Sequence, residues 1–242
     1  MTLSGKRVLV TGGTTGIGRA TVHQLVAAGA HVLTFGRHQQ TLDDALSDVP
    51  SGSGSVSGLT ADAGTPAGVD AVFAAVDQRL GGLDILVANA ALGAQPLHEM
   101  ADPDWRRVID TNLTGYLACA HQAIPRMRTA GGGHLLFVSS ISVHIKAPGE
   151  SVYAATKGGI NAFAETLRKE IAEQNIKVSV IEPGSVGTDM QPCSQEEQAE
   201  AIARHEMLQA DEIGEAILFA LTRSARCDVV SMRIEPRLQM TA

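Results

Sequence analysis

Short apolar runs recur along this chain, and each is followed by glycine or polar residues. The runs are continuously apolar rather than alternating, which indicates strands that are buried on both faces of a sheet. The predicted strands cover residues 7–11, 31–35, 56–60, 83–89, 134–139, 177–181 and 229–234. Between most of them the apolar residues return at helical spacing, so the pattern predicts alternating strands and helices.

The helices expected in these intervals include residues 19–28, which stop before Gly29, and two long segments at 103–127 and 151–172. Pro103 follows Asp102 at the expected start of the first long segment, where a missing N–H costs little. Pro125 near its end should kink or terminate the helix, because proline removes a backbone donor and crowds the preceding turn.

This alternation predicts an α/β fold, a Rossmann-type doubly wound parallel sheet of about seven strands. The chain has 242 residues, of which 44% are hydrophobic, and that is enough for one large core. We therefore expect a single domain over residues 1–242. The Gly- and Ser-rich stretch at 51–58 is expected to be a surface loop of this domain rather than a linker.

Charge and cysteine usage exclude several classes of function. The net charge is −7 with acidic and basic residues interspersed, which argues against a nucleic-acid partner. Cys119, Cys193 and Cys227 form no C-x-x-C pair, so neither a disulfide framework nor a zinc site is indicated. Because no apolar run approaches membrane-spanning length and the first residues lack a signal core, we expect no membrane partner and a cytoplasmic location.

The first strand runs directly into a glycine-rich turn, Gly12-Gly13-Thr14-Thr15-Gly16-Ile17-Gly18, and then into the first helix. In such a strand–turn–helix unit, free backbone N–H groups and the helix N-terminus bind phosphate oxygens. The glycine spacing is G-x-x-x-G-x-G, which differs from the G-x-G-x-x-G of many dinucleotide sites. The turn favours nucleotide binding, with a merely flexible loop as the alternative.

Three further residues predict proton exchange with a substrate oxygen. Tyr153 and Lys157 lie four residues apart, and Ser140 precedes the tyrosine by thirteen residues. On a helix this spacing places the phenol and the ammonium on one face, where the cation should lower the tyrosine pKa. Such a tyrosine can exchange a proton with a substrate oxygen near neutral pH. The alternative is an amphipathic helix with a tyrosine at its rim and a surface lysine.

Taken together, these residues resemble the short-chain dehydrogenase/reductase family. The similarity extends from residue 6 to about residue 190, and several motifs in family order are more specific than any one of them. It covers T-G-x-x-x-G-x-G at residues 11–18, Asp62, Asn89-Ala90-Ala91, Asn112, Ser140, Tyr153, Lys157 and Pro183-Gly184. The resemblance implies hydride transfer between a nicotinamide and a carbon that bears a hydroxyl or carbonyl group, in a small-molecule substrate.

The resemblance also implies catalytic roles. Tyr153 would be the general acid in reduction, Ser140 would hold and polarise the substrate oxygen, and Lys157 would lower the tyrosine pKa and bind the nicotinamide ribose. Asn112 would hold a water beside Lys157 and complete a proton path, or, alternatively, would cap or kink a helix. Ser139 competes with Ser140, but only Ser140 has the family's separation from Tyr153. The expected cofactor-binding residues are Gly12, Thr14, Gly16, Ile17, Gly18, Arg37, Asp62, Asn89, Tyr153, Lys157, Pro183, Gly184 and Thr188.

The end of the second strand bears on the choice of dinucleotide. An acidic residue there binds the adenosine ribose hydroxyls, whereas an arginine accommodates a 2′-phosphate. Here the sequence is Gly36-Arg37-His38, so no carboxylate repels a phosphate and a guanidinium can bind it. We therefore expect NADP(H) to be favoured over NAD(H), unless Arg37 is only a solvated residue at a helix start. Asp62 would lie against the adenine ring, with a turn or cap role as its alternative.

The motifs do not name the substrate. A polar segment at about 190–210, with helical character, is expected to cover the substrate and to move as a lid. His144 and Lys146 either contact a substrate carboxylate or are solvated loop residues. The chain lacks the glycine-rich tail of many family members, and the sequence after Met232 weakly resembles the branch that includes dehydrogenases of small 3-hydroxy acids and serine.

The leading prediction is an NADP(H)-dependent oxidoreductase. The alternative is a catalytically silent regulator that senses dinucleotides with the same fold, although a sensor has no need of the full catalytic set. A hydrolase is disfavoured because the chain has no G-x-S-x-G turn. Surplus apolar residues on the two long helices, and the pairing of these helices in the family, indicate a homodimer or homotetramer that a charge at Phe163 would test. Alternatively, small residues there only allow close packing on the sheet.

Overall fold

Seven parallel strands form one sheet in the computed structural model, which describes residues 2–50 and 52–239. In sheet order the strands are β3 (Ser55–Thr60), β2 (His31–Gly36), β1 (Arg7–Thr11), β4 (Ile85–Ala88), β5 (Gly133–Val138), β6 (Ile176–Pro183) and β7 (Ser231–Ile234). The order reverses between β1 and β4, which is the arrangement of a doubly wound sheet. The predicted fold class is confirmed, and each strand end lies within two residues of its predicted position.

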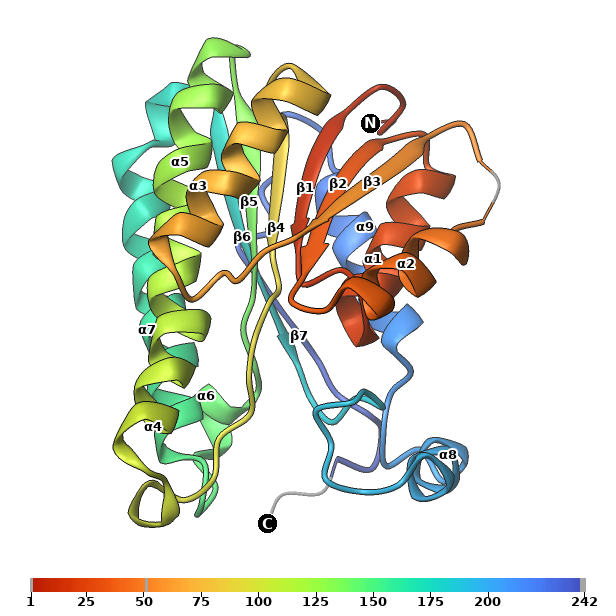
Figure 1. Cartoon of the computed structure of the whole chain (residues 1–242), viewed down its shortest axis with the longest axis vertical. Helices are drawn as coiled ribbons and strands as arrows, with labels where there is room; N and C mark the ends of the chain where they lie inside the picture. The colour runs from red at the N-terminus through yellow and green to blue at the C-terminus, as the bar shows by residue number, and fades with distance from the viewer. Residues whose placement is uncertain (1, 51, 240–242) are drawn as a thin grey trace.

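Helices cover both faces of this sheet (Figure 1). One face carries α3 (Pro66–Ala75), α5 (Gly115–Thr129) and α7 (Ser151–Glu170), and the other carries α1 (Gly16–Ala27), α2 (Gln39–Ser47) and α9 (Ala210–Leu221). Side chains alternate along each strand, so Leu9 joins the core under α3, α5 and α7 whereas Val8 and Val10 join the core under α1 and α9. Burial on both faces explains why the runs are continuously apolar.

Two helix predictions need correction. The first helix begins at Gly16 rather than at residue 19, since the glycine turn itself enters the helix. The second correction concerns the long helix predicted at 103–127. It consists of three successive elements without a break, namely α4 (Asp102–Ile109), the π-helix η3 (Asp110–Thr114) and α5. Pro103 lies in its first turn as expected, but Pro125 does not terminate it, because the helix continues to Thr129, and a kink at Pro125 stays a prediction. Pro125 is exposed, so its ring meets solvent instead of the sheet.

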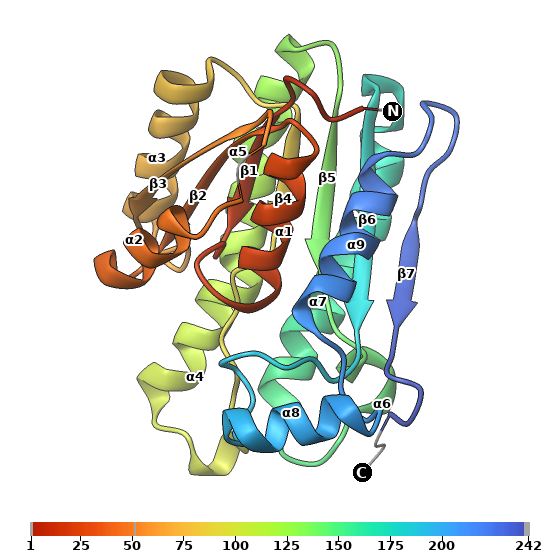
Figure 2. The same ribbon diagram turned by 90° about the vertical axis from the view of Figure 1, so that its right-hand side faces the viewer.

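The shorter elements lie at both ends of the sheet. The remaining helical elements are η1 (Val76–Leu80), η2 (Leu97–Glu99), α6 (Ser142–Ile145), η4 (Ala172–Gln174) and α8 (Gln195–Ala203). Of these, η1 and η4 each precede a strand, whereas α6 and α8 lie beyond the carboxyl ends of the strands, at one end of the molecule (Figures 1 and 2). Ligands of doubly wound sheets bind at this end, at the point where the strand order reverses.

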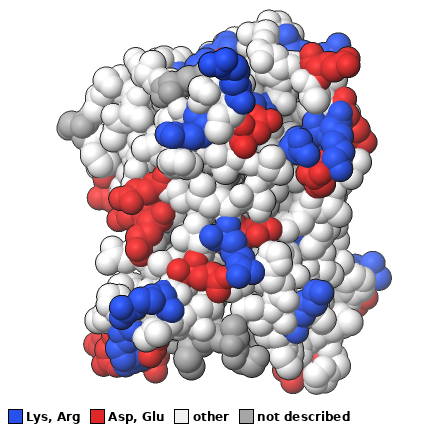
Figure 3. Space-filling model, turned by 180° about the vertical axis from the view of Figure 1, so that it is seen from behind, with Lys and Arg blue, Asp and Glu red and all other residues white. Residues whose placement is uncertain are grey.

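Two surface properties complete the description. Over residues 2–50 and 52–239, no helix combines the length and apolarity that crossing a bilayer requires. On the face that Figure 3 shows, basic side chains lie among acidic ones rather than gathering in one large patch. The interspersed charge expected from the sequence is therefore seen on this face.

Candidate active site

The predicted serine and tyrosine lie beyond the carboxyl end of β5. Ser140 is buried, and its hydroxyl donates to the Ser142 hydroxyl and accepts from the Ser142 backbone N–H, both at 3.1 Å. Tyr153 lies in the first turn of α7 and is half-buried, and its phenol is hydrogen-bonded to Ser140. The fold thus brings together two residues that are thirteen positions apart.

Lys157 follows one turn later on α7 and is 1% exposed. Its ammonium donates to the Val138 carbonyl at 2.8 Å and to the Tyr116 hydroxyl at 3.3 Å. No carboxylate among the residues that the structure describes forms an ion pair with it. Desolvation without a counter-ion lowers the pKa of Lys157 from 10.5 to about 7.

Burial also determines the proton affinity of the tyrosine. Desolvation raises the pKa of Tyr153 to about 12, and the hydrogen bond with Ser140 offsets this only in part. The Lys157 ammonium lies 5.6 Å from the centroid of the Tyr153 ring, but its hydrogen bonds go to Val138 and Tyr116. The two side chains are neighbours on α7 as expected, but the net pKa of Tyr153 lies above its usual value of 10 rather than below it, because desolvation outweighs any lowering by Lys157.

Asn112 is fully buried in η3. Its Oδ1 accepts from the backbone N–H of Leu92, and its Nδ2 donates to the carbonyl of the same residue, both at 2.8 Å. The side chain therefore fastens the loop after β4 to the helix, a role close to the cap-or-kink alternative. π-Helical turns such as η3 are frequent at functional sites. The predicted role of Asn112 in holding a water beside Lys157 stays a prediction.

Hydrogen bonds hold the glycine turn against the carboxyl end of β4, where the order of the sheet reverses. Gly12 has φ +66°, and a Cβ at Gly18 would lie 2.1 Å from the Gly12 carbonyl oxygen. Asn89 donates through Nδ2 to the carbonyls of Thr11 and Gly12, at 3.1 Å each. The Thr11 hydroxyl accepts from the backbone N–H groups of Asn89 and Ala90 at 2.8 and 2.9 Å. Sequence analysis had not anticipated this role of Thr11.

The N-terminus of α1 is open to an anion. Its N-cap residue, Thr15, makes no side-chain capping bond, and the first turn contains no acidic residue. Gly16 has φ +51°, and a Cβ there would lie 2.9 Å from Cγ2 of Thr188, so the loop after β6 packs closely on the turn. Half-buried Ile17 anchors the helix start to the core under α9. Free N–H groups and the helix dipole at a tight glycine turn fit the pyrophosphate of a dinucleotide.

The end of β2 lies beside the same turn. Gly36 has no room for a side chain, because a Cβ there would lie 2.6 Å from Cγ2 of Thr14. Arg37 comes next and is exposed, and its side chain has no hydrogen-bond or ion-pair partner within the described ranges. The guanidinium is therefore available for a ligand.

The other expected cofactor residues also follow strands. Asp62 accepts from the backbone N–H of Gly64 at 2.9 Å, and its carboxylate lies 3.6 Å from the Arg107 guanidinium of α4. These bonds agree with its turn alternative, and the adenine contact stays a prediction. The Pro183 carbonyl accepts from the N–H of Ile141 at 2.9 Å, and the Gly184 N–H donates to the Ile234 carbonyl at 2.7 Å.

Glu182 is a functional candidate that sequence analysis missed. It is buried at the end of β6, where it accepts from Asn161 Nδ2 at 2.6 Å and from His144 Nε2 at 3.0 Å. The network connects β6, α7 and α6. It uses Nε2 of His144, while Lys146 is exposed, and a contact of either residue with a substrate carboxylate stays a prediction. A single carboxylate in an otherwise apolar run was the available signal.

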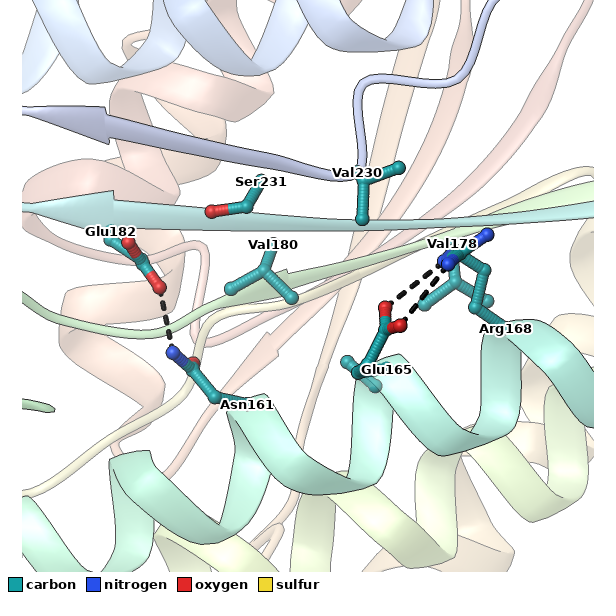
Figure 4. Close-up of a pocket in the computed structure, with 9 residues that line it drawn as sticks. Asn161, Glu165, Arg168, Val178, Val180, Glu182, Val230 and Ser231 are labelled. Carbon is teal, nitrogen blue, oxygen red and sulfur yellow. Dashed lines mark hydrogen bonds and ion pairs between the residues drawn. The ribbon is translucent and has the colours of Figure 1, made fainter.

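Figure 4 shows where this network lies. Glu182 and Asn161 line one end of a cavity of about 180 Å³, and the Glu165–Arg168 ion pair lines the other end. The cavity lies between α7 and the β6–β7 edge, further along α7 than Lys157. It is therefore separate from the opening that Pro96, Leu97 and His98 line together with Gly149 and Ser151, just before and at the start of α7.

The expected substrate-covering segment contains α8, none of whose residues is buried. The Ser194 hydroxyl caps this helix, accepting from the Glu197 N–H at 3.2 Å, and Gln198 donates to the Thr188 carbonyl at 3.3 Å. At its far end Leu208 donates to the Ser185 carbonyl at 2.9 Å. The segment is helical as predicted and attached at both ends to the loop after β6, and its movement as a lid stays a prediction.

Comparisons with known proteins agree with this geometry. The sequence profile of the short chain dehydrogenase family matches residues 6–199. The 3-oxoacyl-(acyl-carrier-protein) reductase FabG of Chlamydia pneumoniae is 37% identical over 192 residues, which cover 78% of this chain and 77% of the relative.

Two solved structures are similar over almost the whole chain. A short-chain type dehydrogenase/reductase from Mycobacterium marinum has a TM-score of 0.85 at 28% identity and covers 98% of this chain and 96% of its own. A single-residue variant of the actinorhodin polyketide ketoreductase, solved with NADPH, has a TM-score of 0.86 at 27% identity, covering 96% of this chain and 97% of its own.

Proposed function

The chain belongs to the short-chain dehydrogenase family, and we propose that it is an NADP(H)-dependent oxidoreductase that interconverts a carbonyl and a hydroxyl group of a small substrate. The observation that carries this proposal is the convergence of Ser140, Tyr153 and Lys157 at the carboxyl end of the sheet. The glycine turn that fits a pyrophosphate lies at the same end.

In reduction, bound NADPH supplies the hydride that the substrate carbon accepts. Tyr153 donates its proton to the substrate oxygen, and the Ser140 hydroxyl donates a hydrogen bond to that oxygen, so that the negative charge developing there is stabilised. The raised pKa of Tyr153, about 12, keeps the phenol protonated at neutral pH, which is the form that reduction requires. The Lys157 cation then favours the phenolate that remains.

The dinucleotide would be held by residues from four strand ends. The turn at residues 12–18 would bind the pyrophosphate, and the free guanidinium of Arg37 would bind the 2′-phosphate of NADP(H). Asn89 would lie along the cofactor, and Thr188 would contact the nicotinamide carboxamide. Lys157 would bind the nicotinamide ribose. The NADPH named with the ketoreductase neighbour supports this preference but does not decide it.

The proposal extends to substrate class and assembly. The names of two relatives refer to a 3-oxoacyl reductase and a ketoreductase, which supports a ketone or 3-oxo compound as substrate. The three free cysteines, of which Cys227 is exposed, suit a reducing compartment, so the proposed location is the cytoplasm. We further propose a homodimer or homotetramer through α5 and α7, where Leu117 is 36% exposed.

The test is to incubate the purified protein with NADPH or NADH and a panel of ketones, aldehydes, 3-oxo acids and 3-oxo thioesters. Loss of reduced-nicotinamide absorbance with at least one carbonyl, abolished in Tyr153→Phe, is the expected result. Dinucleotide binding without turnover of any compound would favour the regulator instead. Absence of dinucleotide binding would rule out both functions.

A further inference from the structure

Both tyrosines of this sequence flank the buried lysine. The Lys157 ammonium lies 5.0 Å from the centroid of the Tyr116 ring and 5.6 Å from that of Tyr153. It donates to the Tyr116 hydroxyl at 3.3 Å and to the Val138 carbonyl at 2.8 Å, and the Tyr116 hydroxyl donates to the same carbonyl at 3.2 Å. Ammonium, phenol and carbonyl thus form a closed triangle under the candidate active site.

The Tyr116 ring is fixed by packing. Tyr116 lies at the start of α5, directly after the π-helix η3, and is 2% exposed. Its ring stacks on Phe137 of β5, with centroids 6.3 Å apart. At Gly115 the start of α5 packs against the segment after β3, because a Cβ there would lie 2.5 Å from the Ala63 carbonyl oxygen. Because packing fixes the ring, it also fixes the position of the hydroxyl, which is therefore a preorganised acceptor for the ammonium.

The triangle matters because the cation has no carboxylate partner among the described residues. The titratable groups around it are Tyr153 on its own helix, with Glu150 before it, and Tyr116 and Cys119 on α5. Burial raises the pKa of Tyr116 well above 10 and that of Cys119 to about 12, so both stay neutral. Within the described residues, neutral groups therefore stabilise the charged form of Lys157, and each lost hydrogen-bond acceptor disfavours it.

Resting on the proposed function, we propose that Tyr116 is a positioning residue whose buried hydroxyl holds the Lys157 ammonium beside Tyr153. It acts through Lys157 and has no contact with the substrate oxygen in the proposed reaction. The hydroxyl and the Val138 carbonyl together favour the charged form of the buried ammonium and orient it.

The test is Tyr116→Phe, which keeps the stacked ring and removes only the hydroxyl. NMR of protein labelled with ¹³C at the lysine side chains reports each of the five lysines, with the Lys157 signal assigned by Lys157→Met. In the wild type the Lys157 signal should titrate near 7. In Tyr116→Phe its midpoint should fall by about one pH unit, the lower end of what a lost hydrogen bond to a charged group produces. In the pH profile of kcat/KM, the limb that reports the titration of Lys157 should also move to lower pH.

Cys119→Ala is the matched control, since Cys119 lies one turn further along α5 and is equally buried. It alters packing without removing the hydroxyl and should leave the midpoint in place. An unchanged midpoint in Tyr116→Phe, or an equal shift in Cys119→Ala, would overturn the assignment. Because the NMR titration needs no turnover, it decides the role of Tyr116 even if no carbonyl is reduced, an outcome that would count against the proposed function alone.

Discussion

Arg37 provides the sharpest test of dinucleotide choice. It is exposed and makes no side-chain bond to another residue in the described part of the chain, so Arg37→Gln removes a cation without breaking an internal interaction. Gly36→Asp, the obvious way to repel a 2′-phosphate, is a poorer perturbation. Its Cβ would lie 2.6 Å from Cγ2 of Thr14, so the aspartate would displace the glycine turn as well as adding charge.

The expected magnitude follows from the contact that is lost. A hydrogen bond to a charged group contributes about 1.5–3 kcal/mol, and each 1.4 kcal/mol corresponds to roughly a tenfold change in an equilibrium or rate ratio. Because water and salt screen an exposed guanidinium, the lower end applies, and Arg37→Gln should reduce the preference for NADPH by about tenfold. The effect should be larger at low ionic strength.

The assay is kcat/KM for NADPH and for NADH with one substrate, at low and at physiological salt. Arg128→Gln is the matched control, since Arg128 is also exposed but lies in the last turn of α5, at the opposite end of the sheet. An Arg37→Gln enzyme with the wild-type NADPH-to-NADH ratio would refute the reasoning, as would a wild type that uses both dinucleotides equally well. To introduce an acidic residue at this position, Gly36→Asp should be combined with Thr14→Ala, because the smaller side chain at position 14 makes room for the aspartate.

Three further predictions concern the chemistry, the assembly and the stability of the protein. Tyr153→Phe should lose nearly all turnover while NADPH affinity, followed by fluorescence, changes little; near-normal turnover would remove Tyr153 from the mechanism. Leu117→Asp should shift an oligomer toward monomer in light scattering, with Leu97→Asp on an exposed loop as control, and a monomeric wild type would contradict the interface. The free energy of unfolding should rise between pH 7 and 9 by up to about 1.4 kcal/mol per unit, because the unfolded chain binds the Lys157 proton more tightly than the folded one. Denaturant titrations of wild type and Lys157→Met at several pH values test this, because the free energy of unfolding should depend less steeply on pH in the variant. Above pH 9 the raised pKa of Cys119 opposes the increase in stability in both proteins.

Phe163 illustrates how the structure sharpened one prediction. The sequence pattern marks it as surplus apolar surface, but its ring packs edge-on against Phe137 at 5.7 Å and is only partly exposed. A charge at this position would damage the core and mimic loss of an interface. Leu117, which is more exposed and lies on α5, separates the two effects.

What the sequence predicted well is what periodicity and chain order determine. The apolar runs located the strands because burial on both faces leaves few polar residues in them, and the order of motifs located Ser140, Tyr153 and the glycine turn at one end of the sheet. Contacts between residues that are far apart in the sequence could not be predicted from periodicity and motif order. The Glu182 network joins residues from three separate elements, and the bonds from Thr11 to Asn89 depend on the pairing of β1 with β4.

The pKa values were misjudged for a related reason. Helical spacing correctly makes Tyr153 and Lys157 neighbours, but spacing says nothing about the depth at which a pair is buried. At this depth desolvation exceeds the attraction between the two groups, so the pKa of the phenol rises to about 12 and that of the ammonium falls to about 7. A surface pair with the same spacing would have shifted in the opposite direction.

This depth makes Lys157 costly to the fold. The difference between an unfolded pKa of 10.5 and a folded value of about 7 corresponds to about 4–5 kcal/mol of lost stability at neutral pH. That is a large share of the net stability of a typical domain, and an apolar side chain of similar volume would stabilise the fold. Stability therefore does not explain a lysine at this position. The need for a cation close to Tyr153 does explain it. Tyr116 and Val138 hold this cation, and no carboxylate among the described residues pairs with it. A neighbouring carboxylate would cancel the field that favours the phenolate.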